Sequence, residues 1–216
     1  MTLREANLND LDQITSLGLA ALHDDPIWPY RFPRAGEYPG DHFKYSRLRF
    51  SEYLENAKQG VYAVMVIEAL SEKDSIEKEI IAMSFWALPG YHLPKTVKSP
   101  SDHPERRDAD PTRMAEFRKV VGRAKKTYFD EVFGDAQINL MILATHPDYR
   151  RLGAAAMLLD WGQEKARAEH VAVTLFSSPM GYPLYVKKGF TKVTSVRVQI
   201  EGDDAFADLP VMVWEP

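Results

Sequence analysis

This chain of 216 residues lacks several features, and each absence narrows the classes of protein to which it can belong. It has no cysteine, which excludes disulfides, thiolate metal sites and a cysteine nucleophile. No window approaches the roughly 20 consecutive apolar residues of a membrane-spanning helix, and the longest apolar runs, 61–70 and 80–88, are only as long as strands. The formal net charge of −4 gives no reason to expect binding to nucleic acid, which needs a basic face. We therefore expect neither a nucleic-acid partner nor a membrane partner.

The start of the chain lacks the apolar segment of a secretory signal peptide, because Arg4, Glu5 and Asp10 carry charges too early. The six histidines are scattered along the sequence, so we expect no metal site. The length suits one domain, 1–216, and a charged fraction of 27% is ordinary for a soluble globular protein. We expect a cytoplasmic protein made of a single domain.

Hydrophobic periodicity predicts a mixed α/β (α+β) fold, with strands first and a strand–helix–strand unit later. The segment 23–41 holds four prolines and is predicted to be an ordered loop. A loop is also predicted from Pro89 to Pro111, followed by a helix with a stripe from Met114 to Tyr128. A helix through 43–57 is expected to bury a stripe that includes Arg47. Strands are predicted at 2–5, 61–68, 79–88, 137–145, 171–177, 194–200 and 210–214, and further helices through 11–22, from 154 to about 170, and at 180–188.

The most uniformly apolar segment, 137–145, is typical of a central strand that is covered on both faces. It leads into RRLGAA at 150–155, where a helix is predicted to begin. The unpaired N–H groups and the dipole of a helix start both favour an anion. Gly153 allows the backbone to approach a ligand, and arginines form charge-assisted hydrogen bonds to phosphate. The residues alone leave open either a phosphate or pyrophosphate site or a helix start with arginines in solvent. The segment is neither a P-loop nor a dinucleotide fingerprint.

The same segment resembles a family signature. RRLGAA at 150–155 is similar to the Arg/Gln-x-x-Gly-x-Gly/Ala signature of the GNAT superfamily of acetyl-CoA-dependent N-acetyltransferases, and LATHPDYRR at 143–151 resembles the run that precedes it. SSP at 177–179 and YVKKGF at 185–190 resemble the late Tyr-x-x-x-Gly-Phe motif. The resemblance covers 137–193 and implies a mostly antiparallel central sheet of six to seven strands, with helices on both faces and the fourth and fifth strands splayed apart.

By this resemblance, the segment 137–193 binds acetyl-CoA, the acetyl donor. Tyr185 would act as the general acid that protonates the leaving thiolate, although a buried aromatic core residue is the alternative. Ser178 stands where many members carry asparagine, so that contact is a departure from the pattern. The residues that the resemblance assigns to acetyl-CoA are Leu143, Ala144 and Thr145 through their backbone, Arg150, Arg151, Leu152, Gly153, Ala154 and Ala155 around the pyrophosphate, and Ser178.

The acceptor side is less defined. The resemblance places the loop 23–41 at the acceptor and suggests that Trp28, Tyr30 and Phe32 form its wall, although these rings could instead cap the core. The insertion 89–134 is expected to shape the pocket. No histidine or carboxylate lies along 137–143, and the candidates for a general base, chosen by residue type alone, are His23, Asp24, Asp25, Glu68 and Glu116.

The sequence therefore predicts an N-acetyltransferase that transfers an acetyl group to the amine of a small molecule, as a monomer or homodimer and without a metal. Two alternatives stay open. The acceptor could be the amine of a protein or peptide, or the protein could be a non-catalytic regulator that binds acyl-CoA on the same fold.

Overall fold

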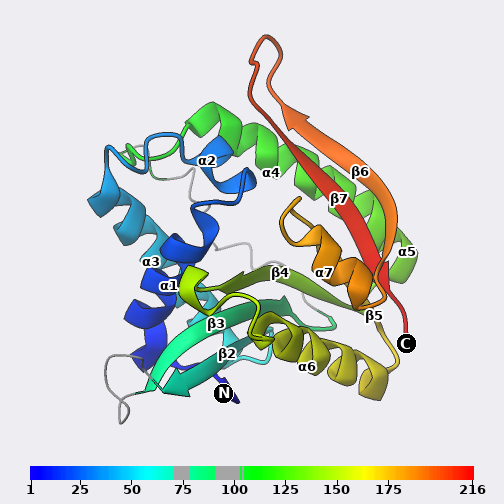
Figure 1. Cartoon of the computed structure of the whole chain (residues 1–216). Coiled ribbons are helices and arrows are strands. Elements are labelled where there is room, and N and C mark those ends of the chain that lie inside the picture. The colour runs from blue at the N-terminus through cyan, green and yellow to red at the C-terminus, as the bar shows by residue number, and fades with distance from the viewer. Residues whose placement is uncertain (71–77, 91–102, 104) are drawn as a thin grey trace.

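The computed structural model describes residues 1–70, 78–90, 103 and 105–216, and shows one seven-stranded sheet in the order β1-β2-β3-β4-β5-β7-β6 (Figure 1). Neighbouring strands are antiparallel except β4 and β5, which are parallel. The connection predicted between β2 and β3, and most of the loop predicted after Pro89, lie outside the described residues. The strands are β1 (Thr2–Glu5), β2 (Tyr62–Leu70), β3 (Lys78–Ala87), β4 (Gln137–Thr145), β5 (Ala172–Phe176), β6 (Thr191–Gln199) and β7 (Phe206–Trp214).

Helices cover both faces of this sheet (Figure 1), as predicted. Alternate side chains of a strand point to opposite faces: Val64 and Val66 pack in the cluster with α1 and α3, whereas Met65 and Ile67 pack with α6. We call these sides the α1 face and the α6 face. The α1 face carries α1 (Leu11–Leu22), α3 (Pro39–Ala57) and α4 (Pro111–Lys125), and the α6 face carries α6 (Ala154–Glu169) and α7 (Tyr182–Lys187).

The segment 23–41 contains a short helix, α2 (Ile27–Arg31), where only a loop was predicted. Its proline, Pro29, lies in the first turn, where a missing N–H breaks no intrahelical hydrogen bond. The Asp25 carboxylate accepts a hydrogen bond from the Ile27 N–H (3.0 Å) and so supports the helix start. The high proline content of 23–41 therefore did not exclude a short helix in this segment.

The buried stripe of α3 also differs from the prediction. Arg47 is exposed and forms an ion pair with Asp12 (2.6 Å), and Phe43 is 36% exposed. Phe50 and Leu54 of the predicted stripe are buried, and the helix also buries the rings of Tyr45 and Tyr53. A tyrosine ring contributes large apolar area to the core, so these two rings move the buried stripe away from Phe43 and Arg47.

The remaining short helical segments fall in the connections. After α4 the chain continues through the π-helical turn η3 (Lys126–Asp130) and α5 (Glu131–Phe133), and the segments η1 (Leu8–Asp10) and η4 (Pro147–Tyr149) precede α1 and α6. No helix among the described residues is long and apolar enough to span a membrane.

The strands β4 and β5 separate partway along their length. Gln137–Leu140 pairs with Ala172–Leu175, and there the pairing ends, although β4 continues to Thr145 on the side of β3. The β3–β4 register shifts where the pairing with β5 stops, which leaves Met141 as an extra residue in β4; such a bulge bends a strand. The result is the splayed pair that the resemblance implies, with its vertex at Leu140.

Candidate active site

The loop between β4 and α6 has an unusual backbone. Arg151 and Gly153 adopt left-handed conformations, with φ of 66° and 92°. A Cβ atom at Gly153 would meet nothing within 4 Å, so the backbone conformation, and not crowding, favours glycine here. Gly153 is also the N-cap of α6 and provides no side-chain cap. The N–H groups in the first turn of α6 are therefore open toward a ligand that can accept hydrogen bonds.

The side of β4 that faces β5 provides a second open surface. Beyond Leu140 no described residue pairs with the strand on that side, and backbone groups at an unpaired edge can bond to a ligand as a further strand would. At the end of this edge the Thr145 hydroxyl is buried and has no hydrogen-bond partner among the described residues. Of the other two predicted residues, Ala144 is buried and Leu143 half-buried. An extended ligand with amide groups fits this edge.

The two arginines of the loop have different surroundings. The Arg150 guanidinium donates hydrogen bonds to the Ala21 carbonyl oxygen and to the Asp24 carboxylate, both at 3.1 Å. It therefore connects this loop to the end of α1. Arg151 is exposed, as is Leu152, so Arg151 is the one with a free side chain for a phosphate.

Ser178 lies between β5 and α7. Its hydroxyl oxygen accepts a hydrogen bond from the Gly181 N–H (3.2 Å), and its carbonyl oxygen accepts one from the Ser177 hydroxyl (2.7 Å). The side chain thus supports the turn into α7, and its half-buried position leaves room for one further contact.

Tyr185 projects from α7 into the core of the α6 face. It is 7% exposed, and its ring centroid lies 5.6 Å from that of Phe190. Its hydroxyl makes no hydrogen bond with any described residue. Burial raises the pKa of the Tyr185 phenol, and the nearby Asp25 carboxylate raises this pKa further. The hydroxyl therefore keeps its proton over the whole neutral range.

The three aromatic residues predicted for the acceptor wall lie in different environments. Tyr30 is 4% exposed in a cluster with Val198 and Leu209, and its hydroxyl is buried without a partner among the described residues. Phe32 is also buried, whereas Trp28 is half-buried, with its ring centroid 4.7 Å from that of Phe32. Trp28 is therefore the ring that retains a surface for a ligand.

Behind Trp28 lies a buried polar network that the sequence did not predict. The Trp28 indole N–H donates to Nε2 of His42 (2.9 Å), so Nδ1 of His42 carries the proton and donates to Asp108 (2.6 Å). Arg106 donates two hydrogen bonds to Asp108 (2.6 and 2.7 Å). Burial opposes ionisation of Asp108, but the bonds from Arg106 and His42 outweigh it and lower the Asp108 pKa. His42 and Asp108 are 66 residues apart, so no spacing rule could have paired them.

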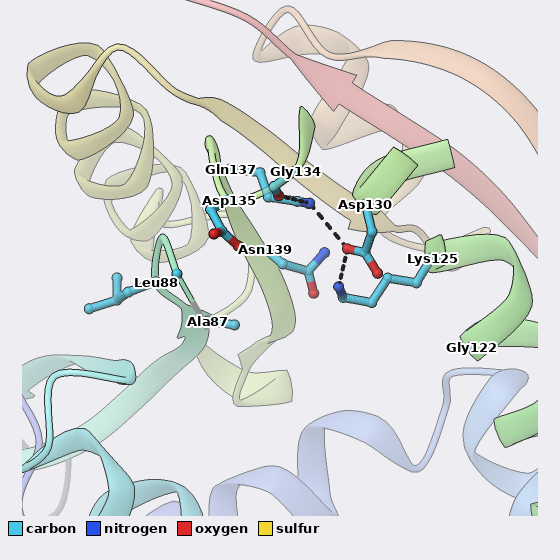
Figure 2. Close-up of a pocket in the computed structure, with 10 residues that line it drawn as sticks. Ala87, Leu88, Gly122, Lys125, Asp130, Gly134, Asp135, Gln137 and Asn139 are labelled. Carbon is cyan, nitrogen blue, oxygen red and sulfur yellow. Dashed lines mark hydrogen bonds and ion pairs between the residues drawn. The ribbon is translucent and has the colours of Figure 1, made fainter. Parts of the chain in front are cut away.

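A cavity of about 430 Å³ opens on the α1 face beside the first residues of β4 (Figure 2). Asn139, one residue before the vertex of the splay, donates hydrogen bonds to the carbonyl and hydroxyl oxygens of Thr174 (3.1 and 2.9 Å). Thr174 in turn donates to Gln137, which donates to Asp130 (3.2 Å) beside Lys125. With both amide hydrogens engaged, the Asn139 amide oxygen is left to accept a hydrogen bond. The cavity is lined by Ala87, Leu88, Gly90, Gly122, Lys125, Asp130, Gly134, Asp135, Gln137 and Asn139.

The candidates for a general base do not come together. Glu68 accepts a hydrogen bond from Arg4 (2.7 Å), and Glu116 pairs with Lys119 (3.0 Å). His23 is exposed, and Asp24 pairs with Arg150. Of the five, only Asp25 acts electrostatically on Tyr185. The part of the chain that the structure describes contains no group of three histidine, aspartate or glutamate side chains that could hold a metal ion.

Comparison with known proteins points to acetyltransferases. Residues 120–202 match the model of the acetyltransferase (GNAT) domain family. The chain is 26% identical over 209 residues to an acetyltransferase of Stachybotrys chartarum, covering 94% of this chain and 85% of that protein. Both comparisons agree with the resemblance to the GNAT superfamily that the sequence motifs indicated.

Solved structures share the fold over the whole chain. An arylalkylamine N-acetyltransferase-like 5b protein of mosquito has a TM-score of 0.65 at 17% identity, with coverage of 100% of this chain and 99% of that one. The polyamine N-acetyltransferase of Drosophila melanogaster has a TM-score of 0.62 at 14% identity, again covering 100% and 99%. PaiA N-acetyltransferase of Thermoplasma acidophilum, in complex with coenzyme A, has a TM-score of 0.54 at 13% identity and covers 100% and 98%.

Proposed function

We propose that this protein is an acetyl-CoA-dependent N-acetyltransferase that acetylates the amine of a small molecule. One observation carries the proposal: within the described parts of the chain, the edge of β4 beyond Leu140 has no partner toward β5. This edge ends at the Thr145 hydroxyl, which is buried without a hydrogen-bond partner there, and leads to the uncapped start of α6. An open strand edge suits the amide-bearing arm of acetyl-CoA, and an uncapped helix start suits its pyrophosphate.

The donor would be held mainly by backbone. Leu143, Ala144 and Thr145 would bond the pantetheine arm along the open edge, while the N–H groups from Leu152 to Ala155 would surround the pyrophosphate. Arg151 would add a charge-assisted hydrogen bond. Arg150 would contribute its backbone, since its side chain is engaged with the end of α1. Ser178 would contact the donor from the side of β5.

The reaction would be direct attack of a neutral amine nitrogen on the thioester carbonyl carbon. A C–N bond forms, the C–S bond breaks, and Tyr185 donates its proton to the departing sulfur. Asp25 would accept the proton that the attacking amine loses. Correct placement of the two reactants alone can lower the barrier by roughly 7 to 11 kcal/mol, so most of these residues would act by positioning.

The acceptor would approach from the α1 face. Trp28 would contact it at the rim, and Phe32 and Tyr30 would support that wall from behind. The cavity beside Asn139 would hold the body of the acceptor, with the amide oxygen of Asn139 accepting a hydrogen bond from it. A small-molecule acceptor is supported by two proteins of the same fold, one named as arylalkylamine N-acetyltransferase-like and the other as a polyamine N-acetyltransferase.

The first test is thermal unfolding of the purified protein with acetyl-CoA, coenzyme A or ATP. A ligand at about 100 times its Kd stabilises by roughly 2.7 kcal/mol, which is a shift of several degrees for a chain of this size. We expect shifts with acetyl-CoA and coenzyme A but not with ATP. No shift with either would mean that the start of α6 is only a helix terminus, and would refute the proposal.

The second test is thiol release with a panel of amines and peptides. Turnover of small amines supports the proposal, and a strong preference for peptides would instead favour a protein acetyltransferase. A thermal shift without turnover of any amine would identify a non-catalytic binding protein.

A further inference from the structure

Arg31, the last residue of α2, differs from the paired arginines around it. Its guanidinium carbon lies over the rings of Phe117 (4.6 Å), Trp28 (4.9 Å) and Phe32 (5.2 Å). Its Nε donates to the Ile27 carbonyl oxygen (3.3 Å), and no described carboxylate forms an ion pair with it. By contrast, Arg106 and Arg113 each donate two hydrogen bonds to one aspartate. The terminal nitrogens of Arg31 therefore lack an acceptor among the described residues.

A half-buried cation without a counter-ion is costly, and ring faces compensate for only part of the lost hydration. Desolvation lowers the Arg31 pKa to about 10, and Asp25 opposes this change. The guanidinium thus remains charged at neutral pH. It lies among three aromatic rings, and its terminal nitrogens are still available as donors.

Asp25 links this cation to the reaction centre. Its carboxylate accepts a hydrogen bond from the Ile27 N–H (3.0 Å), and Arg31 Nε donates to the carbonyl oxygen of the same residue (3.3 Å), so both groups lie around one turn of α2. The Asp25 carboxylate also raises the pKa of Tyr185. If the acceptor amine lies beside Asp25 and Tyr185, a second group of the same molecule can reach Arg31. A planar guanidinium binds a carboxylate through two parallel hydrogen bonds, which a lysine cannot reproduce.

We infer that Arg31 binds a carboxylate of the acceptor, so that the preferred substrates are amino acids or related amines that carry a carboxylate close to the amine. This inference rests on the proposed N-acetyltransferase function. Arg31 would act as a specificity-determining residue. It contacts the acceptor and takes no part in proton transfer.

The test compares two acceptors that differ only by the carboxylate, phenylalanine and 2-phenylethylamine, in the wild type and in Arg31→Gln. We expect the wild type to favour phenylalanine. We expect Arg31→Gln to lower kcat/KM for phenylalanine by about 10- to 100-fold, the size of a lost hydrogen bond to a charged group, and to change it little for 2-phenylethylamine. The ratio between the two acceptors within one variant cancels any general loss of activity.

Two further variants separate recognition from folding. Arg31→Lys retains the charge and the ring contacts but not the planar fork, and we expect it to lose a large part of the preference. Arg123→Gln, an exposed position on α4, should leave both acceptors unaffected. Equal losses for both acceptors with a lowered Tm would show that Arg31 only fastens α2 to α4, and would overturn the inference.

An acetyl-transfer preference for 2-phenylethylamine that Arg31→Gln does not alter would also overturn the inference, while leaving the proposed function intact. Failure of the proposed function has a different signature, namely no thermal shift with acetyl-CoA or coenzyme A and no turnover of any amine of the panel by the wild type.

Discussion

Tyr185 combines two roles that look like alternatives in the sequence. Its ring belongs to the core, packed against Phe190 and over Gly181, where an added Cβ would lie 2.9 Å from the ring. Its hydroxyl nevertheless has no partner among the described residues. The packed ring fixes the position of the hydroxyl, and no described residue uses the hydroxyl proton in a structural hydrogen bond. The proton is therefore available for donation at a fixed place. The role of general acid stays a prediction, and the geometry is compatible with it.

We expect Tyr185→Phe to lower kcat by about 100-fold or more, within the range typical of general acid catalysis. The thermal shift with coenzyme A should persist, because the ring remains. Since burial and Asp25 raise the Tyr185 pKa above its ordinary value of about 10, ionisation of this phenol should not reduce wild-type kcat below about pH 10. The measurement is kcat against pH between 6 and 10.

Tyr182→Phe, on the same helix and half-buried, is the matched control and should behave like the wild type. Unchanged turnover of Tyr185→Phe across the pH range would remove the tyrosine from the mechanism.

At the scale of elements, the site depends on α2 and on the segment 105–110. Asp108, with no exposed surface, accepts hydrogen bonds from Arg106 and from His42 of α3, and His42 accepts one from Trp28 of α2. Three pieces of chain are thus joined through one carboxylate. The network holds Trp28, a residue of α2, and Phe32 is the C-cap of the same short helix. It therefore orients two of the rings that contact Arg31.

We expect Asp108→Asn to destabilise the fold by about 3–5 kcal/mol, because it leaves the buried Arg106 cation without its counter-charge. The lowered Asp108 pKa means that the ionised carboxylate stabilises the folded state at neutral pH. This contribution should disappear as the pH falls below about 4. The measurement is urea unfolding at pH 7 and at pH values down to 3.

Asp41→Asn provides a contrast at a similar ion pair. Asp41 pairs with Arg107, which is on the surface (2.8 Å), and its removal should change stability little, as is usual for exposed pairs. If Asp108→Asn is no more harmful than Asp41→Asn, the buried network does not carry the stability that we assign to it.

At the scale of the whole molecule, the sequence predicted the layers better than the connections. Buried runs such as Ile138–Leu140 and Val173–Leu175 have strong local signals, so the central strands and the helices on both faces were predicted. The last hairpin is longer than predicted, since β6 alternates exposed and half-buried residues around Ser195 and so has a weak apolar pattern. The point at which β4 and β5 separate came from the family resemblance, because pairing register depends on residues that are distant in sequence.

How well the site could be predicted also depends on how far apart its residues lie in the sequence. The loop 150–155 is continuous in sequence, so its composition alone indicated either an anion-binding turn or a helix start with arginines in solvent. Anion binding by this loop stays a prediction. Asp25 lies in the turn before α2 and Tyr185 in α7, and only the tertiary fold allows the Asp25 carboxylate to act on the Tyr185 phenol. The 66-residue separation of His42 and Asp108 hides that pair in the same way.

The donor loop and the acceptor side are also physically joined. Arg150, in the loop that would bind the pyrophosphate, donates hydrogen bonds to Ala21 and Asp24 at the end of α1. Asp24 directly precedes Asp25, whose carboxylate accepts a hydrogen bond from the Ile27 N–H. The next residue, Pro26, is the N-cap of α2. A ligand that orders the loop 150–155 should therefore also restrict the junction of α1 and α2.

We expect coenzyme A to slow amide hydrogen exchange at 141–156, where open backbone groups become bonded, and also at 21–27 through Arg150. In Arg150→Ala the protection at 21–27 should be lost, whereas Arg123→Gln should retain it. Protection confined to 141–156 in the wild type would show that the donor site and the acceptor side are independent. Protection in both segments would mean that binding the donor prepares the residues around Asp25 and Arg31 for the acceptor, so that donor and acceptor binding favour each other.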